Sequence, residues 1–142
     1  MSLAKDLEIY RAASALLKFA LAVQAQVPRA YRVAVGQRIA NECADILLLV
    51  ARANVARGSS RQAQIESLLE RLEAATVLMR AAHELRIIST GKWAQSIELT
   101  DSVGKQASGW LKATQRGADE ALPPPMLPTG GSGDLFSAAP AA

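Results

Sequence analysis

The stretch IESLLERLEAATVLMRAAHEL, residues 65–85, decides the fold class. Its apolar residues recur every three or four positions, whereas Glu66, Glu70, Arg71 and Glu73 fall between them. This spacing places the apolar side chains on one face of an α-helix. We therefore predict an amphipathic helix that ends near residue 88 and that buries Ile65, Leu68, Leu72, Ala75, Met79, Ala82 and Leu85.

Two further helices are expected before this one. Pro28 lacks an N–H and clashes with the preceding turn, so it separates a helix over about residues 4–26 from one over about residues 30–55. The first of these carries two apolar rows, which indicates cover by the bundle on one side and by another subunit on the other. One row contains Leu3, Leu7, Tyr10, Ser14, Leu17 and Leu21, and the second contains Ile9, Leu16, Phe19 and Val23.

Capping residues mark the remaining helix ends. Ser59 and Gln62 have the spacing of a capping box, which starts the helix that contains residues 65–85. Ser89 offers an N-cap oxygen for a fourth helix, which extends to about Gln115 and ends at Gly117. Four helices joined by short turns predict an all-α fold, an antiparallel up-down-up-down four-helix bundle.

Charge is distributed unevenly along the 142 residues. All 16 Lys and Arg, but only ten of the 13 Asp and Glu, precede Ala118, so residues 1–117 carry a net charge of +6. A basic domain of this kind has the electrostatics expected of a nucleic-acid partner. From Ala118 onward Pro, Gly and Ala dominate, and such a segment cannot bury enough apolar surface to order itself. We predict a four-helix domain over residues 1–117 and a disordered tail over residues 118–142.

Side chains that would carry catalysis are scarce. His83 and Glu84 are neighbours on a predicted helix and point about 100° apart, so they do not form an acid–base pair. Cys43 falls on an apolar stripe, where a buried thiol is common and a reactive thiolate is not. The Glu-x-x-His pairs of di-iron bundles and the glycine-rich loops that hold phosphates are both missing. We expect a protein that is not an enzyme and has no metal or cofactor.

Charged residues also interrupt every long apolar stretch. Lys18 divides the longest and Asp45 the next, so no membrane-spanning helix is expected. Residues 1–6 lack the plan of a signal peptide, and Cys43 has no second cysteine with which to form an internal disulfide. These features favour a cytoplasmic protein.

Arginines concentrate near the predicted helix ends. The guanidinium group binds phosphate oxygens in a bidentate manner, so an excess of Arg over Lys indicates a nucleic-acid surface. In an up-down bundle the ends that carry Arg29, Arg32, Arg86 and Lys92 meet at one pole. The candidate nucleic-acid-binding residues are Arg29, Arg32, Arg38, Arg52, Arg80, Arg86 and Lys92.

Three motifs in register extend this interpretation. The segments PRxxRxxxGxRI (residues 28–39), LxRxxHELxxIS (78–89) and GWLK (109–112) resemble the accessory variability determinant family of diversity-generating retroelements. They are also similar to the wider set of four-helix proteins encoded in ribosomal RNA intervening sequences. The match spans about residues 7–115 and leaves out the tail.

This resemblance implies a bundle that assembles into a homopentameric barrel and binds RNA and DNA on a basic surface. It further implies association with a retroelement reverse transcriptase during mutagenic copying of a template RNA. Basic motif positions fall on Arg32, Arg38, Arg80 and Lys112, and positions where close helix approach would explain a glycine fall on Gly36 and Gly109.

Two alternatives share the expected fold. In the first, the double apolar rows of the helix over residues 4–26 bind a partner protein, and the arginines only keep the surface soluble. In the second, the chain belongs to the intervening-sequence branch and has no polymerase partner. Trp93 and Trp110 are expected to serve mainly as packing residues, so phosphate contacts would dominate any nucleic-acid binding.

Overall fold

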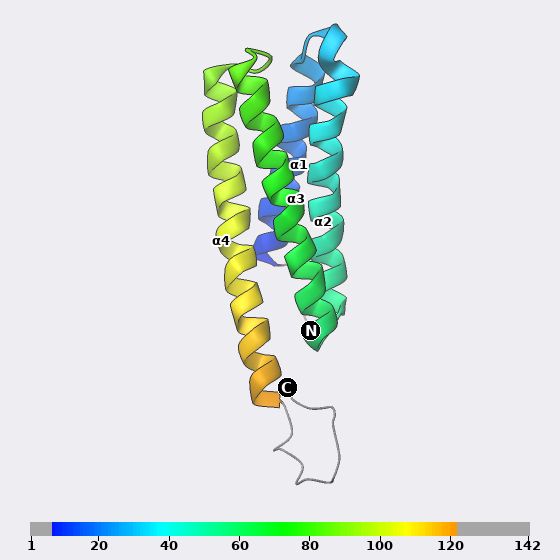
Figure 1. Ribbon diagram of the computed structural model, residues 1–142, viewed down its shortest axis with the longest axis vertical. Helices are drawn as coiled ribbons and strands as arrows, with labels where there is room; N and C mark the ends of the chain where they lie inside the picture. The colour runs from blue at the N-terminus through cyan, green and yellow to red at the C-terminus, as the bar shows by residue number, and fades with distance from the viewer. Residues whose placement is uncertain (1–6, 122–142) are drawn as a thin grey trace.

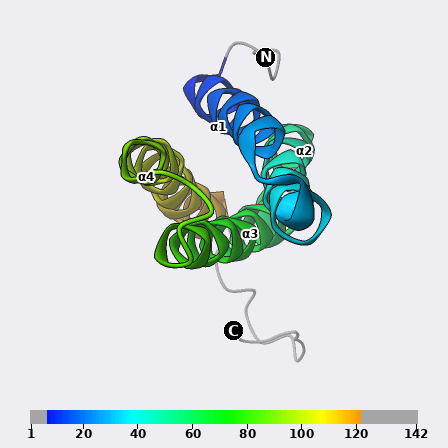
Figure 2. The same cartoon turned by 90° about the horizontal axis from the view of Figure 1, so that it is seen from above.

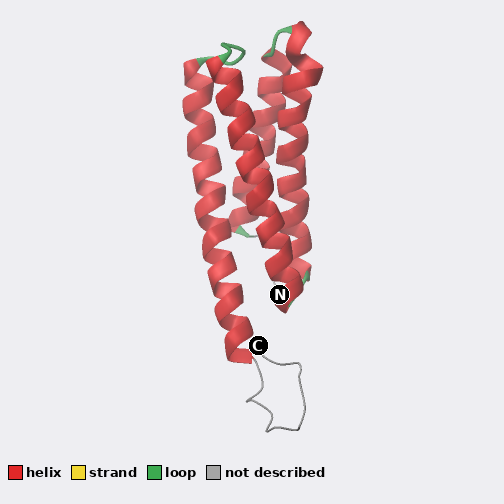
Figure 3. Cartoon of the chain, viewed as in Figure 1, coloured by secondary structure: helices red, strands yellow, loops and turns green. Residues whose placement is uncertain are grey.

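Four α-helices lie alongside one another in the computed structural model, which describes residues 7–121 (Figure 1). The all-α prediction is confirmed, since no strand occurs within this range (Figure 3). Viewed along the helices, α1 lies beside α2, α2 beside α3 and α3 beside α4, and α1 also contacts α4 (Figure 2). The bounds of the four helices are α1 Glu8–Gln26, α2 Arg38–Val55, α3 Gly58–Glu84 and α4 Thr90–Ala121.

One continuous core of aliphatic side chains joins the four helices. The face predicted for residues 65–85 is buried from Ile65 to Ala82, which confirms it. Leu85 is the exception, because α3 ends at Glu84 and the Leu85 side chain is 70% exposed. Burial of such aliphatic groups contributes about 25 cal/mol per Å² of apolar surface removed from water, so this core is the main source of stability.

The two apolar rows of α1 have different surroundings. The row with Ile9, Leu16, Phe19 and Val23 is buried in the core. Ala13 and Ala20 belong to the same face and let the neighbouring helices pack closely. The described members of the other row from Leu7 to Leu17 are only half-buried, and its last member, Leu21, is 51% exposed.

The chain enters α2 through irregular helical turns. Sequence predicted one helix from about residue 30, but a short 3₁₀ turn, Arg29–Tyr31, and a π-helical segment, Arg32–Gln37, precede α2. Close packing accompanies this distortion, because a Cβ on Gly36 would lie 3.3 Å from the backbone Cα of Gln24 on α1. The close approach predicted at Gly36 is therefore confirmed.

A capping contact predicted at one turn is present and another is missing. Ser89 Oγ accepts a hydrogen bond from the Lys92 N–H at 3.1 Å, as predicted for the start of α4. The capping box at Ser59 is wrong, because α3 begins at Gly58 and its N-cap, Arg57, makes no side-chain cap. Arg61 stabilises this turn instead by donating to the carbonyl oxygens of Ala53 at 2.9 Å and Asn54 at 3.0 Å.

The fourth helix is longer than predicted. It continues through Gly117 to Ala121, so the expected helix end at Gly117 is wrong. A glycine inside a helix costs only about 1 kcal/mol relative to alanine and does not end the helix by itself. Four residues assigned to the tail, 118–121, thus extend α4, and the rest of the predicted tail lies outside the described residues.

None of the described helices combines the length and the apolar character that crossing a bilayer requires.

Candidate nucleic-acid interface

The turn between α1 and α2 and the turn between α3 and α4 lie at the same end of the bundle, at the top of Figure 1. We call this end the basic pole and define it by Arg29, Arg32, Arg86 and Lys92. Arg29 and Arg86 are exposed. Arg32 is partly engaged, because its Nη2 donates to the carbonyl oxygens of Val27 at 3.1 Å and Ala25 at 3.4 Å. The structure brings these four residues to one end, with Arg32 also capping α1.

Arg86 has a strained backbone at this pole. Its φ of 60° lies in the left-handed region, which glycine adopts readily and other residues do not. The N–H of Arg86 donates to the carbonyl of His83 at 2.9 Å, and the N–H of Ile87 donates to that of Ala82 at 2.7 Å. These two bonds form a Schellman motif, in which the strained position is usually glycine.

Replacing Arg86 by glycine is therefore expected to raise stability, and the same variant tests whether the Arg86 side chain contacts nucleic acid. Relief of the left-handed strain stabilises the fold, and the more flexible unfolded chain offsets part of the gain, which leaves about 0.5 kcal/mol. If the Arg86 side chain also contacts a phosphate, R86G should bind a 12-nucleotide RNA more weakly in low salt. Urea denaturation and fluorescence anisotropy measure the two effects. R86K is the control and should retain both properties, and a stabilised R86G that binds normally would exclude Arg86 from the interface.

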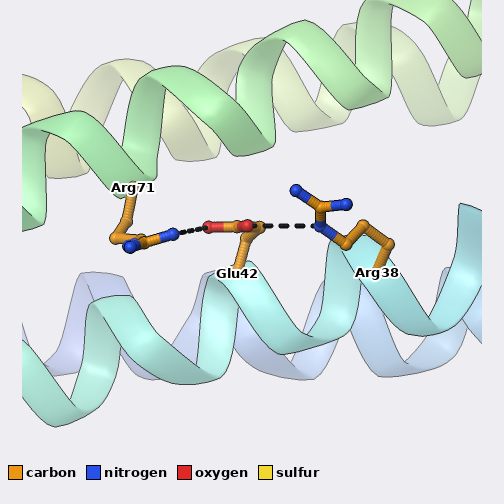
Figure 4. Close-up of polar contacts among 3 residues, drawn as sticks. All are labelled: Arg38, Glu42 and Arg71. Carbon is orange, nitrogen blue, oxygen red and sulfur yellow. Dashed lines mark hydrogen bonds and ion pairs between the residues drawn. The ribbon is translucent and has the colours of Figure 1, made fainter.

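Arg38, another predicted site residue, pairs with a buried carboxylate that the sequence analysis did not single out. Glu42 on α2 is only 4% exposed and lies between two arginines (Figure 4). Its Oε2 is 3.4 Å from Arg38 Nε, and its Oε1 is 3.4 Å from Arg71 Nη1 on α3. Both guanidinium groups also face solvent, with side chains 61% and 51% exposed. Arg38 therefore forms an ion pair with Glu42, and a contact between Arg38 and phosphate stays a prediction.

Along the side of the bundle, α3 and α4 border an open groove of about 760 Å³. Two predicted site residues line it, Arg80 from α3 and Lys112 from α4. Lys105 lines it as well and was missed, although its spacing of seven residues from Lys112 places both on one helical face. The only acidic residue in the lining is Asp101, whose Oδ2 lies 3.0 Å from Lys105 Nζ. The groove lining therefore has a net charge of +2.

Two glycines of α4, Gly104 and Gly109, line the groove and differ in their surroundings. A Cβ on Gly104 would lie 3.3 Å from Leu72 Cδ2, so α3 and α4 approach closely there. Gly109 was expected to mark such an approach, but a Cβ there would meet nothing within 4 Å. The prediction for Gly109 is wrong, and this glycine instead leaves the groove open.

Arg52, another of the predicted site residues, lies apart from the basic pole and from the groove. It is exposed in the last turn of α2, whereas the basic pole is formed by the opposite end of that helix. A cation in the last turn interacts favourably with the helix dipole, which gives Arg52 a local structural role.

His83 and Cys43 have surroundings typical of packing residues. The His83 ring stacks on Trp93 with centroids 5.6 Å apart and an angle of 9° between the planes. Cys43 is fully buried, and burial, with a smaller contribution from the charge of Glu42, raises its pKa from 9.0 to about 12. Among the side chains that the structure describes, residues 7–117, no three His, Cys, Asp or Glu gather as a metal site would require.

No protein family, no curated protein and no solved structure matched the chain.

Proposed function

We propose that this chain is a non-catalytic protein that binds nucleic acid through the groove between α3 and α4 and through the basic pole. The observation that carries the proposal is the groove itself. Arg80, Lys105 and Lys112 line one continuous concave surface with a single carboxylate, Asp101. Cations along a concave surface attract a polyanion and release its counterions.

The resemblance to accessory variability determinants extends this proposal to partners and assembly. Connections at alternate ends of the helices in Figure 1 support an antiparallel up-down-up-down order. Five such subunits would form a barrel that holds a template RNA, and DNA copied from it, against a reverse transcriptase. Exposed apolar side chains on α1 and α2, among them Leu21 and Leu48, suit contacts between subunits.

Salt dependence tests the nucleic-acid binding. If each subunit neutralises about two phosphates, a pentamer engages about ten, and the slope of log K against log salt approaches about −7 on single strands. A lone subunit would give a slope of about −1.4. Anisotropy titrations of a labelled RNA between 50 and 200 mM salt, with the mass measured by light scattering, separate these cases. A slope near zero would refute the proposal.

Charge reversal in the groove tests its location. The double variant R80E/K112E is expected to weaken RNA binding at least about tenfold, because two cations become two anions at the binding surface. The matched control R11E/K18E changes net charge equally at exposed positions of α1 and should cost much less. Circular dichroism checks that both variants remain helical. Equal losses in the two variants would argue against a defined groove site.

A protein–protein adaptor is the second candidate function. The observation in its favour is the partial exposure of Leu21 and Leu48, which a partner helix would cover. Under this alternative R80E/K112E would leave partner binding intact, and the unaltered protein would retain no RNA at moderate salt.

A further inference from the structure

We infer that the groove between α3 and α4 selects single-stranded nucleic acid and packs a base against Trp93. This inference rests on the proposed function, because it names the form of nucleic acid that the same groove takes. The argument starts from the apolar residues of the groove, which phosphate binding alone does not explain.

The groove has aromatic and aliphatic side chains at one end and cationic side chains along the rest. Trp93 and Ile97 line it near the start of α4, whereas Lys105 and Lys112 lie about two and about four turns beyond Ile97 on the same helix. Arg80 lines the same groove from α3. At 1.5 Å per residue, the path from residue 93 to residue 112 spans about 28 Å. This length accommodates several nucleotides, with phosphates on the cations and a base at the aromatic end.

Trp93 is held in place before any ligand arrives. Its ring stacks on His83, and His83 Nε2 lies 3.3 Å from Thr90 Oγ1. Ile97, one turn further along α4, is 46% exposed and lines the same groove as Trp93. A fixed aromatic ring beside an exposed aliphatic side chain provides an apolar surface on which a nucleobase can pack at little cost in side-chain entropy.

Only a single strand can use this surface. In a duplex the faces of the bases are stacked on one another, so a bound duplex would reach the cations but leave Trp93 and Ile97 uncovered. The groove between α3 and α4 is open to solvent, so a single strand can turn a base toward Trp93 while its phosphates lie near the cations. The combination of cations with an apolar end therefore favours RNA or DNA in single-stranded form.

The test compares strands with the duplex in the full-length protein. The probes are fluorescein-labelled 12-nucleotide oligo(U) and oligo(dT), and a 12-base-pair RNA duplex. W93L is expected to weaken binding of both single strands at least about fivefold and to leave duplex binding within about twofold. Similar losses for oligo(U) and oligo(dT) would support packing of a base against Trp93, because both strands present the face of a pyrimidine.

A second measurement avoids removing the ring. In W110F the only tryptophan left is Trp93, and oligo(U) is expected to quench its fluorescence while the duplex does not. Trp110 lies outside this groove, near Arg61, so W110F should bind RNA normally. Equal loss of strand and duplex binding in W93L, or no quenching in W110F, would overturn the single-strand inference. Either result would leave intact the proposal that the protein binds nucleic acid through its cations. Salt-independent binding by the unaltered protein would instead overturn the nucleic-acid proposal itself.

Discussion

Replacing both Arg38 and Arg71 by methionine is expected to lower the free energy of unfolding by about 3 kcal/mol. Breaking a buried ion pair and leaving one charge behind costs about 3–5 kcal/mol. The low end of this range applies, because Glu42 is buried while both arginine side chains are at least half exposed. In the double variant the Glu42 carboxylate keeps no cationic partner on either side. Urea denaturation at neutral pH measures the loss.

The matched control removes the carboxylate instead. E42M leaves two arginines that already face solvent, so its stability should stay within about 1 kcal/mol of the unaltered protein. Adding E42M to R38M/R71M should recover most of the lost stability, because no buried charge then remains. A triple variant as unstable as the double variant would show that the arginine stems, rather than the charges, stabilise this contact.

Raising the pH above 9 is expected to destabilise the protein through Cys43. The thiol ionises near pH 9.0 in the unfolded chain but has a pKa of about 12 in the fold, mainly because of burial. Between these values the unfolded chain has lost the proton and the folded chain retains it, so stability falls by about 1.4 kcal/mol per pH unit. From pH 8 to pH 10.5 the loss is about 2 kcal/mol.

The variant C43A isolates this contribution from other groups that titrate at high pH. It should be less stable at pH 8, because a buried sulfur is removed, but it should lose about 2 kcal/mol less on the change to pH 10.5. Urea denaturation under reducing conditions at both pH values gives the comparison. Identical pH dependence in the two proteins would contradict the burial of the thiol. Labelling by a thiol reagent at pH 8 should also follow unfolding rather than reagent concentration.

Local spacing was sufficient to predict the four helices and much of their inner surface. The apolar period of residues 65–85 identified the buried face of α3 up to Ala82, and Ser89 was correctly placed as an N-cap. One error arose where a contact from another part of the chain replaced a local signal. At the turn before α3, Arg61 reaches back to carbonyls of α2, and no property of Ser59 or Gln62 foretells that.

The candidate site was predictable only in part. Arg80 and Lys112 were identified as basic positions, but that they line one groove with Lys105 depends on how α3 packs against α4. The role of Glu42 was missed, because an arginine and a glutamate four residues apart usually form a solvent-exposed ion pair on a helix surface. Its burial follows from the neighbouring helix, which also brings Arg71 to it.

The sequence by itself determined which side chains share a helix face, because that depends only on 3.6 residues per turn. It also determined the excess of positive charge in residues 1–117. The tertiary structure decided which of the two apolar rows of α1 enters the core, which arginines meet a carboxylate and where α3 and α4 leave a groove. These outcomes depend on how each helix is rotated and how closely it approaches its neighbours, and packing between residues far apart in the sequence fixes both.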